Sequence, residues 1–204
     1  MANKPIFVTG IGTGIGKTIV SAILVEKLKA DYWKPIQSGD LDNSDTLAIR
    51  NLISNSLSVL HPEAYRLTQP FSPHKSAAID GIEIDPATIK APKTSNTLII
   101  EGAGGLMVPL NDQFLIIDLI KQLEAEVILV SQNYLGSINH TLLSASVLKQ
   151  YQIPLKGIIF NGIKDQSSMD YILNYTQAKI LGHIPEYGII DSEMVIDAGN
   201  YITL

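Results

Sequence analysis

A glycine-rich segment near the N-terminus has the residue types of a nucleoside triphosphate site. Residues 7–23 read FVTGIGTGIGKTIVSAI, an apolar run, then closely spaced glycines, then Lys17 and Thr18, then a second apolar run. Glycines let the backbone curl with its N–H groups toward phosphate oxygens, and the helix that follows presents its positive end. A lysine at this place reaches the β- and γ-phosphates, and a threonine hydroxyl binds Mg²⁺. The segment therefore predicts the phosphate loop of a nucleoside triphosphate site, with a cradle formed by Gly14, Ile15, Gly16, Lys17 and Thr18.

The spacing of this loop departs from the usual pattern. The usual loop has four residues between its first glycine and the glycine before the lysine, and in this chain that first position is Ile11. The opening glycine is instead Gly10, with five residues between it and Gly16. The loop is thus a longer variant. A glycine-rich strand-to-helix turn without a ligand is one alternative. A dinucleotide site is another, but no acidic residue at the end of a second strand is well placed for it, and Lys17 and Thr18 would have no role there.

Two acidic residues stand at expected element ends. Glu101 closes the apolar run 97–100 and is followed directly by a second glycine-rich stretch that contains Gly104. An unpaired buried carboxylate is costly, so its position indicates a metal or phosphate role. Asp45 lies at an expected helix start, where it either caps backbone N–H groups or binds the metal. With Thr18, these carboxylates supply the hard oxygen ligands that Mg²⁺ uses.

Lys34 lies where a second strand is expected to end. It follows Tyr32 and Trp33 and precedes Pro35. A lysine before a proline is, taken alone, typical of a solvated surface. The segment KPIQSG, however, also brings the hydroxyl of Ser38 and a glycine turn to the strand tip, where a lysine and a serine can hold an anionic intermediate.

The elements that must position these residues follow from hydropathy. Runs that are apolar on both faces are typical of parallel strands covered by helices. Residues 57–94 are richer in Pro, Ser and His and are expected to form loops and short helices over one sheet edge. The pattern predicts one α/β domain over residues 1–204, a mostly parallel twisted sheet with helices on both faces, as in P-loop NTPases. The expected strands are 6–9, 32–34, 97–101, 127–131, 157–161 and 179–182, and the expected helices are 19–29, 115–123 and 139–151.

Composition limits the possible partners. The 204 residues are 46% hydrophobic and 17% charged, with a net charge of −5 and no basic cluster. This balance argues against nucleic acid or an anionic membrane surface as a partner. The chain has no cysteine, and its start lacks the pattern of a signal peptide or membrane span. We expect a cytoplasmic protein.

Several segments together resemble the dethiobiotin synthetase family, nearly from end to end. VTGIGTGIGKT is similar to the elongated phosphate loop of that family, YWKPIQSG to its lysine segment and NSDTLAI to its aspartate segment. PFSPHKSA resembles its lid anchor, EGAGGLMVPL its acidic glycine loop, and LGSINHTLLS its dimer-contact helix.

The resemblance implies an ATP-dependent cyclo-ligase. A diamine, 7,8-diaminononanoate, is carboxylated by CO₂ on one nitrogen, the carbamate takes the γ-phosphoryl group of ATP, and the second amine closes a cyclic urea. In this reading Lys34 is the active-site lysine, Thr13 and Ser38 bind the carbamate or the amines, and Gly104 leaves room for the substrate. Lys17 acts on the phosphates. The metal ligands are Thr18, Asp45 and Glu101, and the metal is Mg²⁺.

The resemblance also implies a homodimer whose substrate site is closed by the neighbouring subunit, with Asn139 at one end of the diamine. Without the resemblance, the segment after Gly136 is an ordinary amphipathic helix capped by Ser137, Asn139 and His140.

Base recognition departs from the family pattern. Asn161 can still pair with adenine, but Gly162 stands where the family commonly has aspartate. Selectivity against guanine is therefore open. Pro185 and Glu186 are similar to the family's adenine-side loop, and either can instead be a plain loop residue.

Two rival classes share the phosphate loop. One is the switch ATPase of septum placement or chromosome partition, although Ile11 and Gly12 stand where such proteins carry an early second lysine. That class also places a basic or amphipathic helix at a terminus, which this sequence lacks. The other is a small-molecule kinase, in which the phosphate ends on the acceptor rather than in solution.

Overall fold

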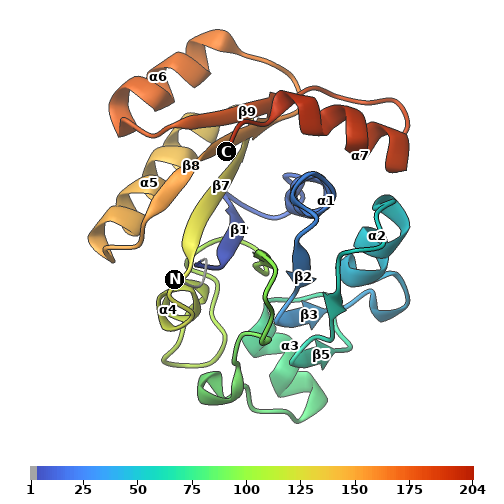
Figure 1. Cartoon of the computed structure of the whole chain (residues 1–204). Coiled ribbons are helices and arrows are strands. Elements are labelled where there is room, and N and C mark those ends of the chain that lie inside the picture. Colours follow the sequence, from blue (N-terminus) through green and yellow to red (C-terminus); the bar gives the residue numbers. More distant parts are fainter. Residues whose placement is uncertain (1–3) are drawn as a thin grey trace.

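The computed structural model describes residues 4–204 and forms a sheet covered by helices on both faces (Figure 1). The large sheet has the order β4-β2-β6-β1-β7-β8-β9, and every neighbouring pair in it is parallel. A separate pair, β3 and β5, lies beside it. The strands are β1 (Ile6–Gly10), β2 (Asp31–Trp33), β3 (Ile36–Ser38), β4 (Leu60–His61), β5 (Tyr65–Leu67), β6 (Leu98–Glu101), β7 (Glu126–Gln132), β8 (Leu155–Asn161) and β9 (Ile180–Ile184).

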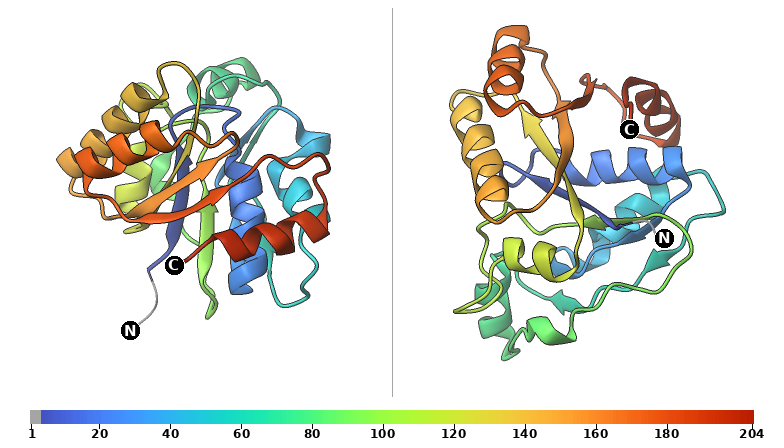
Figure 2. Two further views of the ribbon diagram at one scale, coloured as in Figure 1. Left: turned by 90° about the horizontal axis from the view of Figure 1, so that it is seen from above. Right: turned by 60° about the vertical axis from the view of Figure 1, so that its left-hand side comes forward.

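The helices divide between the two faces. Helices α1, α2 and α7 cover one face, and α4, α5 and α6 cover the other, as the two views of Figure 2 show. The helices are α1 (Lys17–Leu28), α2 (Asp45–Leu52), α3 (Pro73–Asp80), α4 (Ile116–Gln122), α5 (Ser137–Gln150), α6 (Gln166–Thr176) and α7 (Ser192–Ala198), with short 3₁₀ turns at Leu41–Asn43, Pro86–Thr88 and Gly199–Tyr201.

Alternating side chains of the central strands build the two cores. In β1, Val8 packs into the cluster beneath α1, whereas Phe7 packs into the cluster beneath α4. Both side chains are fully buried. Such strands are apolar on both faces because helices cover both sides, which confirms the predicted parallel α/β architecture.

The prediction for residues 57–94 is incomplete. The expected short helix is present as α3, but the segment also contributes β4 to the edge of the large sheet and β5 to the small one. The strand β3 was not predicted either. These strands are only two or three residues long, so a period of two cannot show in their sequence.

The C-terminal residues lie along the outer strand. Ile202 forms an antiparallel bridge with Gly182 of β9, and the backbone N–H of Thr203 donates to the carbonyl of Leu181 at 2.7 Å. The edge of β9 is therefore partly covered by the same chain. Within residues 4–204, no helix has both the length and the apolar character needed to cross a membrane.

Candidate active site

The phosphate loop connects β1 to α1 and begins the helix earlier than expected. α1 starts at Lys17, not at residue 19, so Lys17 and Thr18 lie in its first turn. Gly14 and Gly16 have φ angles of +74° and +90°, which favour glycine. The ammonium of Lys17 donates to the carbonyl of Gly12 at 2.9 Å and so lies folded over the loop.

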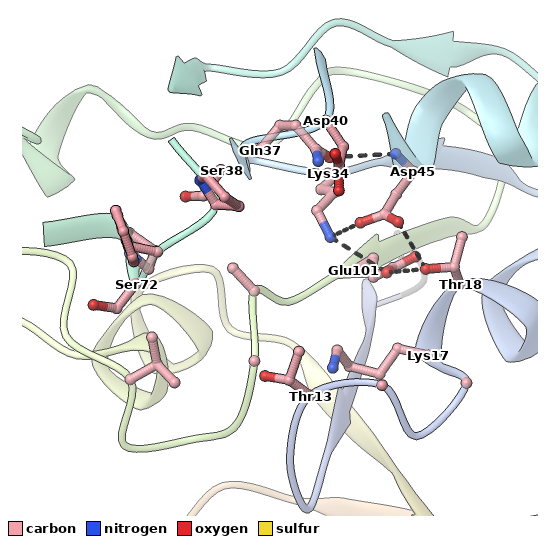
Figure 3. A pocket seen from close by; sticks show the side chains of 18 of the residues that line it. Thr13, Lys17, Thr18, Lys34, Gln37, Ser38, Asp40, Asp45, Ser72 and Glu101 are labelled. Carbon is pink, nitrogen blue, oxygen red and sulfur yellow. Dashed lines mark hydrogen bonds and ion pairs between the residues drawn. The ribbon is translucent and has the colours of Figure 1, made fainter. Parts of the chain in front are cut away.

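Two carboxylates, a hydroxyl and an ammonium meet at the carboxyl ends of the strands next to this loop (Figure 3). The hydroxyl of Thr18 lies 3.0 Å from Oδ1 of Asp45 and 2.8 Å from Oε1 of Glu101. Lys34 forms ion pairs with both acids, the one to Glu101 at 3.3 Å. Glu101 and Lys34 are buried, with 1% and 5% of their surface exposed.

The electrostatics of the two lysines differ. Burial opposes the charged form of Lys34, but the carboxylates of Glu101 and Asp45 outweigh this and raise its pKa. Burial lowers the pKa of Lys17, and the nearby Lys34 adds to this effect, while Glu101 opposes it. Lys34 is therefore held as a cation between two anions.

A cavity of about 660 Å³ opens above this cluster. It is lined by the phosphate loop, by Lys34 and Ser38 beyond β2, and by the residues after Glu101. Ser38 also lines the cavity, and its hydroxyl is buried and has no hydrogen-bond partner among residues 4–204. The predicted site residues that line this cavity are Thr13, Gly14, Gly16, Lys17, Thr18, Lys34, Ser38, Asp45, Glu101 and Gly104.

Other predicted residues lie outside this cavity. Ile15 is buried, with 3% of its surface exposed, and its side chain packs in the apolar cluster beneath α1. Its carbonyl accepts a hydrogen bond from Nδ2 of Asn161 at 3.0 Å. Gly162 follows at the end of β8, and its N–H donates to the carbonyl of Ile184 at 2.9 Å, which brings Pro185 and Glu186 beside it.

Asn139 belongs to a third region. It lines a groove of about 840 Å³ between the start of α5 and α6. Its side chain is exposed. Within one chain, the structure does not bring Asn139 to the cavity beside Lys34.

Two capping alternatives are wrong. The cap of α2 is Ser44, whose hydroxyl accepts from the N–H of Leu47, while Asp45 is the first helical residue and turns its carboxylate to Thr18 and Lys34. The N-cap of α5 is Gly136 with φ of +101° and no side-chain hydrogen bond. His140 instead contacts the hydroxyl of Tyr134 at 2.8 Å.

Sequence reasoning missed several residues that line the cavity or support it from behind. Gln37 accepts from the N–H of Asp45 at 3.3 Å and so ties β3 to the start of α2. Phe71 and Ser72 line the opposite wall, before α3. Tyr32, which is fully buried, donates to Oε2 of Glu101 at 3.0 Å. The segment PFSPHKSA pointed to the wall, but no local signal pointed to Tyr32.

Comparisons with known proteins identify the family of the chain. A family model described as an AAA domain matches residues 4–193. The chain is 52% identical over 193 residues to the ATP-dependent dethiobiotin synthetase BioD of Cytophaga hutchinsonii, covering 94% of this chain and 93% of the relative. It is 53% identical to the protein of that name from Christiangramia forsetii, covering 95% and 92%.

Two solved structures with a similar fold are more distant in sequence. The septum site-determining protein MinD from Pyrococcus horikoshii, complexed with Mg-ADP, has a TM-score of 0.60 at 18% identity, covering 95% of this chain and 86% of that one. A ParA family ATPase from Chlorobium tepidum has a TM-score of 0.58 at 13% identity, covering 98% and 100%. These likenesses concern the fold, whereas the relatives above share about half of their residues over nearly the whole length. The chain therefore belongs to the ATP-dependent dethiobiotin synthetase family.

Proposed function

We propose that residues 1–204 form one domain that closes the ureido ring of dethiobiotin from 7,8-diaminononanoate, CO₂ and ATP. Family membership supports the reaction. The single observation that carries the assignment to this site is the convergence of a phosphate loop, a buried lysine and two carboxylates on one cavity.

The proposed reaction has three bond-forming steps. One amine of the diamine attacks CO₂ and, after losing a proton, becomes a carbamate. A carbamate oxygen attacks the γ-phosphorus of ATP, and ADP leaves. The second amine then attacks the carbonyl carbon of the carbamic-phosphoric anhydride, inorganic phosphate leaves, and the ring closes. Negative charge accumulates on carbamate and phosphoryl oxygens, so placement and cations are the protein's main contributions.

The chain supplies these contributions from three elements. Lys17 turns from the carbonyl of Gly12 to the phosphates, and Lys34 stabilises the carbamate. The hydroxyls of Thr13 and Ser38 donate to the carbamate or orient the amines, for which the unpartnered hydroxyl of Ser38 is suited. Gly104, on the opposite wall, leaves room for the substrate.

The residues beside Lys34 fit a Mg²⁺ ion. Thr18, Asp45 and Glu101 bring three oxygens close together, and hard oxygen ligands of this kind are the ones that Mg²⁺ uses. When bound, the ion neutralises charge on the phosphoryl oxygens during transfer. Each of the two carboxylates, Asp45 and Glu101, would then interact with both the ion and the ammonium of Lys34.

We also propose that the base of ATP lies at the ends of β8 and β9. Asn161, Gly162, Pro185 and Glu186 are close together there, beside the phosphate loop. Asn161 reads the base edge with the part of its amide that is not engaged by the carbonyl of Ile15.

A homodimer is the proposed active form. Apolar side chains are exposed around α5, among them Leu135 at 104% and Leu143 at 56%. Asn139 is exposed on the same helix, so a second subunit packed there can bring it to the partner's diamine. An apolar cavity of about 420 Å³ between the phosphate loop and α5 continues toward this surface. The cytoplasm, which supplies ATP and Mg²⁺, is the proposed location.

The test is phosphate release from MgATP with bicarbonate, with and without 7,8-diaminononanoate, while the organic product is followed by mass. Release that depends on the diamine, with a mass gain of one carbonyl less two hydrogens, is the expected result. A phosphorylated acceptor would indicate a kinase. Hydrolysis without the diamine and without a new organic product would indicate a switch ATPase and contradict the proposal.

A further inference from the structure

Tyr32 contacts the site from behind. It is the middle residue of β2, which lies between β4 and β6, and none of its surface is exposed. Its ring packs in the apolar cluster beneath α1, together with Ile23 and Ile99. It does not line the cavity above Lys34. Any effect of Tyr32 on the reaction must therefore pass through another residue.

That other residue is Glu101, whose two oxygens have different surroundings. Oε1 faces the hydroxyl of Thr18 at 2.8 Å and the ammonium of Lys34 at 3.3 Å. Oε2 accepts a hydrogen bond from the phenol of Tyr32 at 3.0 Å, and this is the one hydrogen bond that Oε2 makes among residues 4–204. The carboxylate thus has a front oxygen at the site and a back oxygen in the apolar core.

The hydrogen bond from the phenol of Tyr32 determines which oxygen of Glu101 faces the cavity. A buried carboxylate oxygen without a donor costs about 1–3 kcal/mol, so Oε2 stays with the phenol rather than rotating away. The side chain of Trp33, the next residue along β2, points to the other face of the sheet, where its Nε1 donates to the carbonyl of Pro62 at 3.0 Å. The alternation of the strand therefore gives this contact to Tyr32 and not to its neighbour.

We propose that Tyr32 is a positioning residue, whose phenol holds Oε2 of Glu101 so that Oε1 is presented to Mg²⁺, Thr18 and Lys34. This inference rests on the metal role of Glu101 in the proposed function. Residues that orient a metal ligand in this way commonly change metal affinity about 10–100-fold when they are replaced.

The experiment measures metal binding rather than turnover. In the full-length protein, a fluorescent ATP analogue is bound first in EDTA and then with increasing Mg²⁺. For Tyr32→Phe we expect the affinity for the metal-free nucleotide to stay within about twofold of the unaltered protein. We expect the Mg²⁺ concentration at half-saturation to rise about tenfold or more.

Matched variants separate this effect from a loss of packing. Tyr65→Phe removes a phenol that bonds Thr88 at 3.0 Å, outside the site, and should leave the Mg²⁺ titration unchanged. At position 32, 4-aminophenylalanine keeps an N–H donor and should restore Mg²⁺ binding. Substitution by 4-fluorophenylalanine fills the same space without a hydrogen-bond donor. This variant replaces Tyr32→Phe in the Mg²⁺ titration if Tyr32→Phe does not fold. A Mg²⁺ titration of either donor-free variant that matches the unaltered protein would overturn the inference.

Glu101→Gln distinguishes this inference from the proposed function. If Glu101→Gln leaves Mg²⁺ binding unchanged, the metal role of Glu101 fails, and the inference fails with it. If Glu101→Gln weakens Mg²⁺ binding and Tyr32→Phe does not, only the positioning role of Tyr32 fails. In the double variant we expect no further loss beyond that of Glu101→Gln, because Tyr32 acts through this carboxylate.

Discussion

The side-chain amide of Asn161 occupies the space beside Gly16 in which a Cβ atom would stand. Its Nδ2 donates to the carbonyl of Ile15 at 3.0 Å, so the end of β8 is tied directly to the phosphate loop. The residue expected to read the base and the residue that shapes the phosphate cradle are thus in contact. A change at Gly16 must disturb both ends of the nucleotide site.

We expect Gly16→Ala to weaken ATP binding about tenfold or more and to lower the free energy of unfolding by about 1–3 kcal/mol. The new methyl group meets the amide of Asn161, and the backbone there has φ of +90°. Titration with ATP and denaturant unfolding measure the two effects. Gly81→Ala is the control, because Gly81 has φ of +66° but open space around it. Equal losses in the two variants would mean that the contact with Asn161 is unimportant.

Lys34→Ala should lower kcat by about 10²–10³-fold while ATP affinity changes only a few-fold, because the proposed role of Lys34 is to stabilise the carbamate rather than to bind the nucleotide. Without Mg²⁺ the variant should also be less stable, since Asp45 and Glu101 lose the cation between them. Single-turnover kinetics and thermal unfolding with and without Mg²⁺ provide the readouts. Lys156→Ala, which removes an ion pair with Glu126 at 2.7 Å, serves as the control. Strong residual turnover would remove Lys34 from its proposed role.

Substituting Asn139 by alanine should raise KM for the diamine about fivefold or more and leave KM for ATP unchanged, if a partner subunit brings this side chain to the substrate. Stability should change by less than about 0.5 kcal/mol, because the side chain is exposed. Asn174→Ala, at an exposed position of α6, is the matched control. An equal rise in both KM values, or no change in either, would contradict the proposed dimer arrangement.

Acid should weaken the contact between α1 and the residues after α2. Burial alone would raise the pKa of Glu26, but hydrogen bonds from Lys29, Asn55 and Ser54 lower it from 4.5 to about 2. The folded-state pKa is thus the lower one, so the contribution is complete above pH 4.5 and is lost as the pH falls toward about 2.

Glu26→Gln should remove about 1–3 kcal/mol of unfolding free energy at pH 7 and flatten the pH dependence of stability between pH 5 and pH 2. Urea unfolding across this range measures both effects. Glu193→Gln is the control, since this acid is exposed in the first turn of α7. A slope that persists in the Glu26 variant would assign the acid sensitivity to other carboxyl groups.

The sequence predicted the parts of the fold that have long apolar runs. The strands around residues 6, 98, 127 and 157 and the helices α1, α4 and α5 were expected, because a buried parallel sheet has a strong pattern, whereas α6 and α7 were not predicted. The start of α1 was placed two residues late, since Lys17 and Thr18 are polar although helical. Short strands such as β4 were missed because two residues are too few to show an alternating pattern of apolar and polar side chains.

Local motifs predicted the site better than long-range contacts did. Lys17, Lys34, Asp45 and Glu101 were expected together, since each stands at a strand tip or helix start, and the cavity contains all four. The contact between Tyr32 and Glu101 joins residues far apart in the chain, and a tyrosine inside a short apolar stretch is indistinguishable from an ordinary core residue.

The position of β1 at the centre of the sheet has a consequence for synthesis. Phe7 pairs with Ile100 on one side and with Val127 on the other, so β1 leaves the ribosome before both of its partners and gains the second one only after residue 127 has been made. The phosphate loop is attached to this strand. A nascent chain therefore gains the ability to bind nucleotide only late, and retention on an ATP resin reports a finished sheet rather than a folded N-terminal fragment.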